Sequence, residues 1–360
     1  MNAEASRPTL AAVAALAGVS PSTASLAFSG AGPVSESTRA KVLAAAEQLG
    51  YAGPDPRAQS LRRGRSGIIG VVIEDRLSDA FRDPMNLAML DGIADELGSD
   101  GFGLLLLTDT GENADISLAP MDGVILVGCS RELDRPVTVF RLRGIPIVAI
   151  EAEPIQGVLP IDLDNRDATA RGARHLAELG HERVALVTLP LDGDRATGEL
   201  TESRIAQSRA HTTLERIRGA RDVYAAAPGW VAGGSSVQDG IEAGLAVLGA
   251  TPRPTAVIAQ SDLLALGVIR AAESLGLAVP DDVSVLGFDG VRIEGAAPYE
   301  ITTLVQPAVA KGRAAGRAVI DLIAGADAKG SAFTSELRVG STTGRALSAS
   351  ASEGAPATRR

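Results

Sequence analysis

Histidine and cysteine are scarce in the chain, which has three histidines, His175, His181 and His211, and one cysteine, Cys129. His175 and His181 flank the end of a predicted helix, where a histidine usually packs or caps the helix. Cys129 ends an apolar run, residues 123–129, that is typical of a buried strand. A single cysteine also excludes an internal disulfide and a cysteine-rich metal cluster.

Known catalytic motifs do not accompany these residues. The sequence contains no Gly-x-Ser-x-Gly elbow, no His-Glu-x-x-His zinc site and no Walker loop. The glycine-rich segment at residues 98–103 follows a predicted helix and precedes a strand, which is the reverse of a dinucleotide-binding loop. We therefore expect a protein without enzymatic activity, metal or cofactor.

Charge is divided unevenly along the chain. The net charge is −10 over 360 residues, but residues 1–67 hold seven basic and four acidic residues, which leaves +3 there and −13 elsewhere. A basic segment on an acidic body approaches phosphate while the body is repelled, which points to nucleic acid. No apolar run approaches the roughly 20 residues that span a bilayer, and the amino terminus lacks the apolar region of a signal peptide. We expect a cytoplasmic protein, associated with the nucleoid, and no membrane partner.

Three short helical patterns fill the first fifty residues. The predicted helices cover residues 10–17, 21–28 and 36–49. A residue that can cap a helix precedes each of them, at Thr9, Ser20 and Ser35, and Pro21 takes the first position of the second, where its missing N–H costs nothing. Only residues 18–20 separate the first two helices, which is the three-residue turn of a helix-turn-helix.

Strands and helices alternate from residue 67 onward. Apolar runs such as residues 68–73 and 147–150 suit strands buried on both faces of a parallel sheet, and a second series begins near Ile161. Two such halves make the cleft between them the expected ligand site. We expect a head of residues 1–50, a hinge of 51–66, a core of 67–340 and a disordered tail of 341–360. The two subdomains of the core are expected to cover 67–162 plus 291–325, and 163–290 plus 326–340.

Two sets of motifs resemble the LacI-type (lactose-repressor) family of transcription regulators. The first is Thr9-Leu-x-x-Val13-Ala14-x-x-Ala17-Gly18-Val19-Ser20, followed by Val34-Ser35-x-x-Thr38-Arg39 and Leu49-Gly50-Tyr51. The second includes Val279-Pro-Asp-Asp-Val-Ser-Val-Leu-Gly-Phe-Asp289. The resemblance implies an N-terminal all-α helix-turn-helix head plus an α/β periplasmic-binding-protein-like core of two doubly wound subdomains.

The same resemblance implies a function. The head would bind double-stranded operator DNA, and a sugar or nucleoside effector in the cleft would control that binding, so that the chain acts as a repressor. No leucine heptads occur near the carboxyl end, which favours a homodimer over a tetramer. The alternative is a stand-alone carbohydrate-binding protein of the periplasmic-binding-protein type. Residues 1–66 disfavour it, because we expect such a protein to start near Gly67 after a signal sequence.

The resemblance also carries over DNA contacts position by position. The contacts expected in the head are Thr9, Ser20, Pro21, Ser22, Thr23, Ser25, Leu26, Ser29 and Thr38. Those expected in the hinge are Arg57, Ala58, Leu61 and Arg62. Leu61 would push between base pairs in the minor groove and kink the duplex. Leu26 stands where the family normally has an arginine, so we hypothesise a contact between Leu26 and a thymine methyl group in place of a bidentate base contact.

Six core residues match ligand positions of the family: Asp167, Arg204, Trp230, Ser261, Asp262 and Asp289. Asp289 would accept hydrogen bonds from ligand hydroxyls, or would simply close a turn. Arg204 lies in an Arg-x-x-Gly pattern that lacks its glycine, and its alternative is a solvated helix face. Trp230 would stack on a sugar ring or pack in the core. Asp167 and Asp262 also suit the negative charge favoured at the start of a helix.

Overall fold

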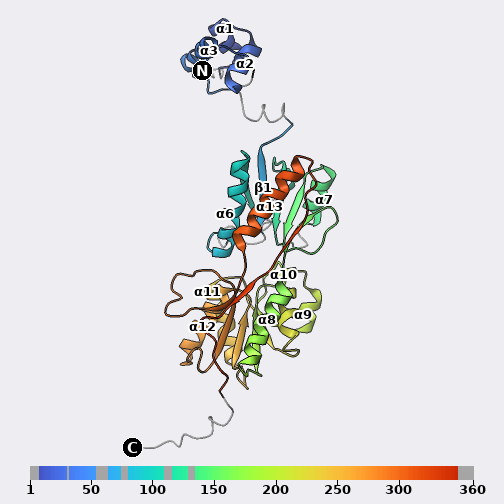
Figure 1. The fold of residues 1–360 in the computed structure, drawn as a ribbon, viewed down its shortest axis with the longest axis vertical. Coiled ribbons are helices and arrows are strands. Elements are labelled where there is room, and N and C mark those ends of the chain that lie inside the picture. Colours follow the sequence, from blue (N-terminus) through green and yellow to red (C-terminus); the bar gives the residue numbers. More distant parts are fainter. Residues whose placement is uncertain are drawn as a thin grey trace, which may run out of the picture. The chain divides into compact units, whose positions relative to one another are not determined.

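The chain folds into two units that are described by a computed structural model. The structure describes residues 8–30, 32–53, 64–73, 80–108, 116–128 and 134–347. Contacts within the chain divide it into residues 1–67 and 68–360. The described part of the first unit holds three helices, α1 (Leu10–Ala17), α2 (Pro21–Ser29) and α3 (Glu36–Leu49), as the sequence predicts (Figure 1).

A side-chain hydroxyl caps each of these three helices. Thr9, Ser20 and Ser35 accept hydrogen bonds from the backbone N–H three residues ahead, at 3.3, 3.1 and 3.2 Å. Each helix ends at a glycine in the left-handed conformation, which only glycine adopts at no steric cost. The core of the unit consists of small or branched side chains: Val13, Ala14, Ala24, Ala27, Val42, Ala45 and Ala46. Alanine interiors let three short helices pack closely.

The second unit is built on two mostly parallel sheets. The first has the strand order β12-β5-β4-β3-β1-β2, and the second has the order β13-β11-β10-β9-β6-β8-β7. The strands of the first sheet are β1 (Ile68–Ile73), β2 (Gly103–Thr108), β3 (Gly123–Val127), β4 (Ile147–Ile150), β5 (Leu159–Leu163) and β12 (Ser331–Phe333). Those of the second are β6 (Val184–Thr188), β7 (Gly198–Glu199), β8 (Gly229–Val231), β9 (Ala256–Ala259), β10 (Ser284–Asp289), β11 (Thr302–Val305) and β13 (Glu336–Arg338).

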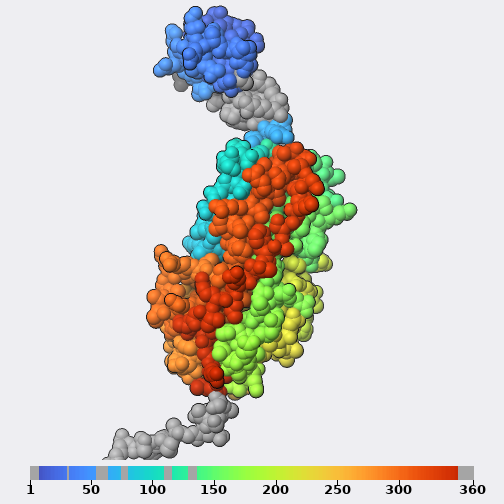
Figure 2. Space-filling model, in the orientation of Figure 1, coloured from blue at the N-terminus to red at the C-terminus, as the bar shows by residue number. Residues whose placement is uncertain are grey.

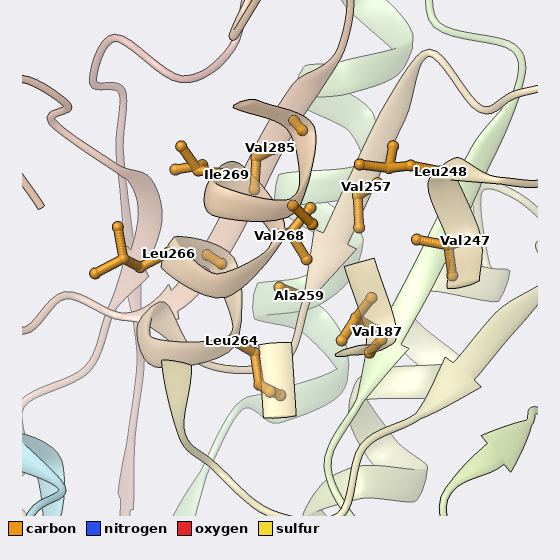
Figure 3. Packing of buried hydrophobic residues seen from close by; sticks show 14 of the residues in the cluster. Val187, Val247, Leu248, Val257, Ala259, Leu264, Leu266, Val268, Ile269 and Val285 are labelled. Carbon is orange, nitrogen blue, oxygen red and sulfur yellow. The ribbon is translucent and has the colours of Figure 1, made fainter. Parts of the chain in front are cut away.

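Helices pack over both sheets, and each sheet with its helices forms one subdomain (Figure 1). The helices of the first subdomain are α6 (Pro84–Ser99), η1 (Ile116–Leu118), α7 (Asp134–Leu142) and α13 (Ala308–Ile323). Those of the second are α8 (Asn165–Glu178), α9 (Glu202–Gln207), α10 (His211–Arg221), α11 (Val237–Leu248) and α12 (Asp262–Ser274). Helix α6 pairs with α13, α8 with α10 and α11 with α12. Figure 3 shows part of the core under α12, where Val268 meets Val257 and Val285 of neighbouring strands.

The subdomain boundaries differ from those predicted. Strand β11 pairs with β10 in the second sheet, and β12 pairs with β5 in the first. Residues 291–305 therefore belong to the second subdomain and 326–333 to the first. The chain crosses between the subdomains three times, after β5, after β11 and after β12. Figure 2 shows the last part of the described core, in orange and red, running along one face of both subdomains.

Two further predictions are wrong in detail. The predicted tail of 341–360 is ordered at its start, because Thr342 is buried and exchanges two hydrogen bonds of 2.7 Å with Val285. Gly340 just before it departs from the family pattern, and a side chain there would meet the carbonyl oxygen of Glu300 at 2.1 Å. The sequence pattern of residues 200–218 predicts one helix, but the chain forms two there, α9 and α10, separated by residues 208–210.

Among the residues that the structure describes, no single helix is both long and apolar enough to cross a bilayer. The pair α1 and α2, which meet at 103°, reaches that length and apolarity only when the two are taken together. Both helices pack their apolar sides into the core of the first unit.

Candidate functional site

Helix α2 buries one face in its own unit and leaves the other open. Ala24 and Ala27 are buried, whereas Pro21, Ser22 and Leu26 are exposed, Leu26 to 38%. Residues 22, 26 and 29 follow the helical repeat and share this open face. The helix carries no charged side chain. It can therefore offer a DNA groove only hydroxyl groups and apolar contacts.

Hydroxyl groups at the start of α2 are fixed by one another. The Oγ atom of Ser20 lies 2.8 Å from both Ser22 Oγ and Thr23 Oγ1. The Oγ1 atom of Thr38 lies 2.8 Å from Ser35 Oγ at the start of α3. A hydroxyl has one donor and two acceptor sites, so these groups keep hydrogen-bonding capacity for a ligand. Hydroxyls and backbone N–H groups at helix starts suit phosphate oxygens.

The structure describes some of the remaining predicted DNA contacts, and others lie outside the described residues. Thr9 and Ser29 are exposed, and Ser25 is half-buried. The Ser29 hydroxyl donates to the Leu26 carbonyl at 3.2 Å. The four hinge residues, Arg57, Ala58, Leu61 and Arg62, lie outside the residues that the structure describes, as does Cys129. Their roles stay predictions from the sequence.

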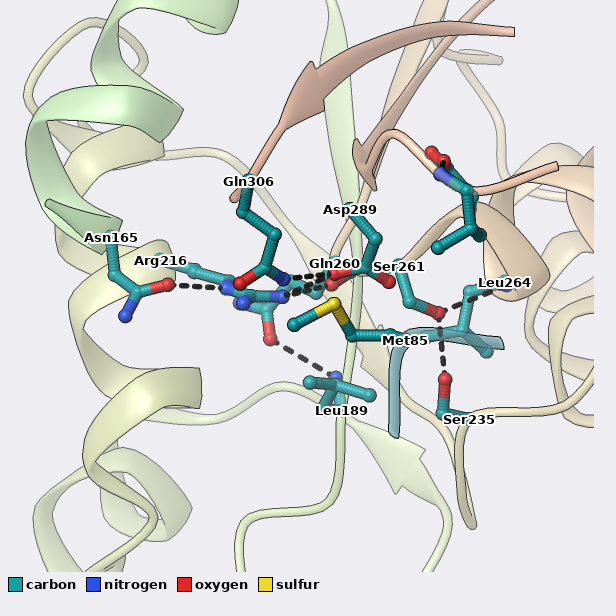
Figure 4. A network of polar contacts seen from close by, with 12 residues as sticks. Met85, Asn165, Leu189, Arg216, Ser235, Gln260, Ser261, Leu264, Asp289 and Gln306 are labelled. Carbon is teal, nitrogen blue, oxygen red and sulfur yellow. Dashed lines mark hydrogen bonds and ion pairs between the residues drawn. The ribbon is translucent and has the colours of Figure 1, made fainter. Parts of the chain in front are cut away.

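In the second unit, a buried arginine organises a polar network between the subdomains. Figure 4 shows the Arg216 side chain reaching from Asn165 to Asp289. Its Nε atom donates to Asn165 Oδ1 at 2.8 Å, and its Nη1 atom lies 3.9 Å from Asp289 Oδ1. The guanidinium carbon also stands 3.6 Å from the centre of the Phe288 ring, a cation–π geometry. The carbonyl oxygen of Gln260 accepts another hydrogen bond from Nη1.

Burial and the charges that face one another act in opposite directions on the pKa values of the network. It lowers the pKa of Arg216, against the raising effect of Asp289 and Glu151. Burial also raises the pKa of Asp289 well above its usual range, although Arg216 opposes the shift. For Glu151, burial acts to raise the pKa, but Lys311 and Arg216 outweigh it and bring the value to about 2. Glu151 is therefore a buried carboxylate that stays charged because two cations face it.

Asp262 has a structural task instead. Its Oδ2 atom accepts hydrogen bonds from the backbone N–H groups of Gly290 and Val291 at 2.8 and 2.9 Å, and its Oδ1 atom accepts one from Thr303 at 2.5 Å. Burial raises its pKa to about 7. One carboxylate oxygen is thus committed to the turn that follows β10 and the other to strand β11, which leaves little capacity for a ligand.

A cavity of about 600 Å³ opens beside this network. Its lining residues are Arg82, Asp83, Asp194, Arg195, Gly233, Gly234, Ser235, Ser236, Val237, Asp239 and Leu263. Arg82 and Asp83 precede α6 in the first subdomain, and the others come from loops and helix starts of the second. Among the described lining residues, only Val237 and Leu263 carry apolar side chains. Such a volume suits a small organic ligand, and the polar lining suits one rich in hydroxyl groups.

Comparison with known proteins identifies the family. The model for bacterial regulatory proteins of the lacI family matches residues 9–53, and the model for a periplasmic binding protein-like domain matches residues 173–343. The HTH-type transcriptional regulator IpsA of Corynebacterium glutamicum is 32% identical over 332 residues, which cover 88% of this chain and 91% of that protein. The chain belongs to the lacI family of bacterial regulatory proteins.

Solved structures agree with this membership. A complex of the transcriptional regulator CelR with cellobiose has a TM-score of 0.64 and 26% identity, covering 93% of this chain and 100% of that one. The lac repressor dimer bound to operator and the anti-inducer ONPF has a TM-score of 0.73 and covers 94% and 99% of the two chains, but its 23% identity supports the fold alone. The predicted fold class is thus confirmed. This LacI-family chain is a DNA-binding transcriptional regulator, and its family consists of regulators rather than enzymes.

The six predicted ligand residues of this LacI-family chain do not gather at the cavity. Asp289 lies in the network of Arg216, and Asp262 holds a turn. The described cavity lining includes none of the six. Ser261 lies next to the lining, because its hydroxyl accepts a hydrogen bond of 2.9 Å from Ser235, which lines the cavity. Ser261 also caps α12.

The other three lie apart. Trp230 is half-buried on β8 and packs against the core cluster of Figure 3. Arg204 donates to the carbonyl oxygens of Ala196 and Glu199 and so ties α9 to its own loop. Asp167 is exposed in the first turn of α8. The positions of Trp230 and Asp167 agree with the alternatives that the sequence left open, whereas Arg204 is bonded to its own loop and does not lie on a solvated helix face. Their roles towards a ligand stay predictions.

Sequence reasoning missed Arg216, although a signal was present. The family's Arg-x-x-Gly pattern is intact at Arg216-Ile-Arg-Gly219, twelve residues after the degraded copy at Arg204. Gly219 is needed because a Cβ there would meet the carbonyl oxygen of Arg166 at 2.1 Å, where α10 crosses α8. The presence of this glycine in the sequence would have pointed to Arg216 instead of Arg204 as the arginine of the pattern.

Proposed function

We propose that this chain is a dimeric repressor that binds operator DNA through its head and responds to a small sugar held in the cavity. One observation carries the proposal: a LacI-family chain combines an open, hydroxyl-capped helix α2 with a polar cavity of about 600 Å³. The head makes a stand-alone carbohydrate-binding protein the poorer account. We further propose that the chain acts in the cytoplasm at the nucleoid. We also propose that it has no catalytic activity, because the members of its family are transcriptional regulators.

At the DNA end, the open face of α2 would enter the major groove. Ser22 and Leu26 would face base edges, while the capping hydroxyls of Ser20 and Thr38 would stand at phosphates. The hinge residue Leu61 would enter the minor groove as the sequence suggests. In a dimer, two heads would bind the halves of a near-palindromic operator.

At the ligand end, the lining supports a sugar over a nucleoside. A base needs a flat apolar or aromatic face, and the described lining offers only Val237 and Leu263 as apolar side chains. The carboxylates of Asp83, Asp194 and Asp239 are acceptors for hydroxyl groups. The cellobiose held by CelR shows that a regulator of this fold accommodates such a molecule.

Selection from a random duplex library tests the DNA end. The chain should enrich a near-palindromic sequence, and the affinity for it should fall by about 10³-fold between ~50 and ~200 mM salt if six phosphates are contacted. Binding that shows no sequence preference at either salt concentration would refute the proposal.

A thermal-shift screen of sugars and nucleosides tests the ligand end. We expect a sugar to raise the melting temperature and nucleosides to have no effect. Asp194→Asn, in the cavity lining, should weaken binding of the sugar by about tenfold, the cost of one charge-assisted hydrogen bond. Asp167→Asn is the matched control, because Asp167 lies on the exposed side of α8. Weakening by the Asp167 variant alone would move the site to the position that the family resemblance implies.

A further inference from the structure

One loop of the second subdomain reaches the cavity without a core of its own. It consists of residues 191–200, called here the flap, and it follows β6 and contains β7. Leu191 and Leu200, at its two ends, are buried in the core of the second subdomain. Every residue between them is exposed or half-buried. Polar contacts must therefore hold the flap in place, because it buries too little apolar surface to do so.

Arg204 of α9 supplies contacts along the length of the flap. Its Nη2 atom donates to the carbonyl oxygen of Ala196, and its Nη1 atom donates to the carbonyl oxygen of Glu199 at 3.3 Å. The Nη2 atom also lies 3.8 Å from Asp192 Oδ2. Hydrogen bonds from a charged donor are stronger than those between neutral groups. One guanidinium thus ties the first, middle and last parts of the flap to α9.

The flap also has bonds of its own. The Asp192 carboxylate accepts a hydrogen bond from the backbone N–H of Ala196, and the Asp192 carbonyl oxygen accepts one from the backbone N–H of Arg195, each at 3.2 Å. Arg195 closes this turn in a left-handed backbone conformation with φ of 52°, which a non-glycine residue seldom adopts. At the far end, β7 pairs with β8, and Glu199 stands opposite Trp230. The turn sets the shape of the flap, and Arg204 sets its place.

The flap forms one wall of the cavity. Asp194 and Arg195 belong to the lining, together with Gly233 and Gly234 of the loop before α11. A Cβ atom at Gly233 would lie 3.2 Å from Thr197 Cγ2, and one at Gly234 would lie 3.6 Å from Arg195 Nη1. The two glycines thus leave room for the flap to approach this loop. The cavity wall keeps its shape only while the flap stays there.

We propose that Arg204 is a positioning residue of the ligand site, which holds the flap so that Asp194 and Arg195 stand in the cavity wall. The inference rests on the proposed function, because it takes the cavity as the sugar site. A carboxylate and a guanidinium offer acceptors and donors to sugar hydroxyls. Without Arg204, the flap would have to be ordered each time a sugar binds, and this ordering weakens affinity. Arg204 acts on the sugar through the flap.

Trp230 makes the position of the flap measurable without any ligand. It is the only tryptophan of the chain, and the side chain of its strand partner Glu199 stands beside it on the same face of the sheet. In Arg204→Met, acrylamide should quench the Trp230 fluorescence about twice as strongly, and amides of residues 195–200 should exchange about tenfold faster. Amides of α11 and α12 should stay within about twofold of the unaltered chain.

Arg218→Met is the matched control. Arg218 is another arginine of the second subdomain, but it pairs with Glu215 on its own helix, α10. The control should leave the exchange of residues 195–200 and the quenching of Trp230 unchanged.

The second measurement uses the sugar that gives the largest thermal shift with the unaltered chain. Arg204→Met should bind this sugar about tenfold more weakly, the effect of losing a charge-assisted hydrogen bond in the site. Its affinity for operator DNA, measured without sugar, should stay within about twofold of the unaltered chain. A residue that only stabilised the fold would not separate the two affinities in this way.

Either of two results would overturn the proposal. One is exchange and quenching no greater in Arg204→Met than in Arg218→Met. The other is a loosened flap with an unchanged affinity for the sugar, which would exclude the flap from the ligand site. If Arg204→Met does not fold, Arg204→Lys replaces it with the same expected and overturning results, because lysine keeps the charge but has one nitrogen where Arg204 uses two.

Failure of the proposed function would look different. An unaltered chain that binds no sugar would refute the cavity as a sugar site. The exchange and fluorescence measurements need no sugar, so they would still decide whether Arg204 holds the flap.

Discussion

Helices α6 and α13 touch through glycines, and replacing one of them gives a sharp test of the packing. A Cβ atom added to Gly92 would lie 2.2 Å from the carbonyl oxygen of Val309 and 3.0 Å from the backbone nitrogen of Arg313. On the facing helix, a Cβ at Gly312 would lie 2.1 Å from the carbonyl oxygen of Met89. Since the clashing atoms are backbone, no side-chain rotamer relieves them, and the two helices must separate.

The magnitude of the effect in Gly92→Ala follows from two opposing terms. Overpacking a core typically costs 1–3 kcal/mol, and a backbone clash belongs at the upper end, about 3 kcal/mol. Alanine gains about 1 kcal/mol over glycine in a helix interior. We therefore expect the free energy of unfolding to fall by about 2 kcal/mol.

Urea denaturation measures this change, and Gly98→Ala is the control. Gly98 lies on the same helix α6, but a Cβ there meets nothing within 4 Å. The control should raise the free energy of unfolding by up to about 1 kcal/mol. If Gly92→Ala stabilises the chain as much as Gly98→Ala does, the helices are not in backbone contact and the account of this packing is wrong.

Three further predictions concern the head and the buried carboxylate of Glu151. Ser20→Ala removes the cap of α2 and should lower the stability of the head by about 1 kcal/mol, seen as a lower melting temperature of a fragment of residues 1–53 if that fragment folds, or as faster exchange of α2 amides in the full chain. Leu26→Ala should keep the fold, because Leu26 is 38% exposed, but should reduce the preference for thymine at one operator position by about 1 kcal/mol; unchanged preference among operator variants would rule out the methyl contact. The folded pKa of Glu151 is lowered from 4.5 to about 2, so its contribution of about 3 kcal/mol is present above pH 4.5 and is lost as the pH falls towards 2. The difference in free energy of unfolding between the unaltered chain and Glu151→Gln should therefore shrink from pH 6 to pH 3, and a difference that grows over this range would contradict the assignment.

The parts that the sequence predicts well are those governed by neighbours in the chain. Thr9, Ser20 and Ser35 each stand one residue before an apolar helical pattern, and all three cap a helix as expected. A cap and the turn before it depend on three or four consecutive residues, so they can be read directly. The alternation of strands and helices in the core is local in the same sense.

Reasoning from neighbouring residues cannot predict which distant segments of the chain pair with one another. Strand β12 has three residues and pairs with β5, which lies some 170 positions earlier, so nothing local assigns it to the first sheet. Burial of Arg216 and Lys311 depends on partners from distant segments, and a charged residue on a helix looks like a solvated one in the sequence. The order of residues 341–347 rests on hydrogen bonds such as that from Val285 to Thr342.

The most direct test of the whole account is the coupling between the two ends of the chain. Operator affinity would be titrated by fluorescence anisotropy, at one salt concentration, with and without the sugar that gives the largest thermal shift. A regulator controlled through its cavity should change its affinity for operator by at least about tenfold, which corresponds to a coupling free energy of about 1.4 kcal/mol. A sugar that saturates the cavity and leaves operator affinity unchanged would contradict the account.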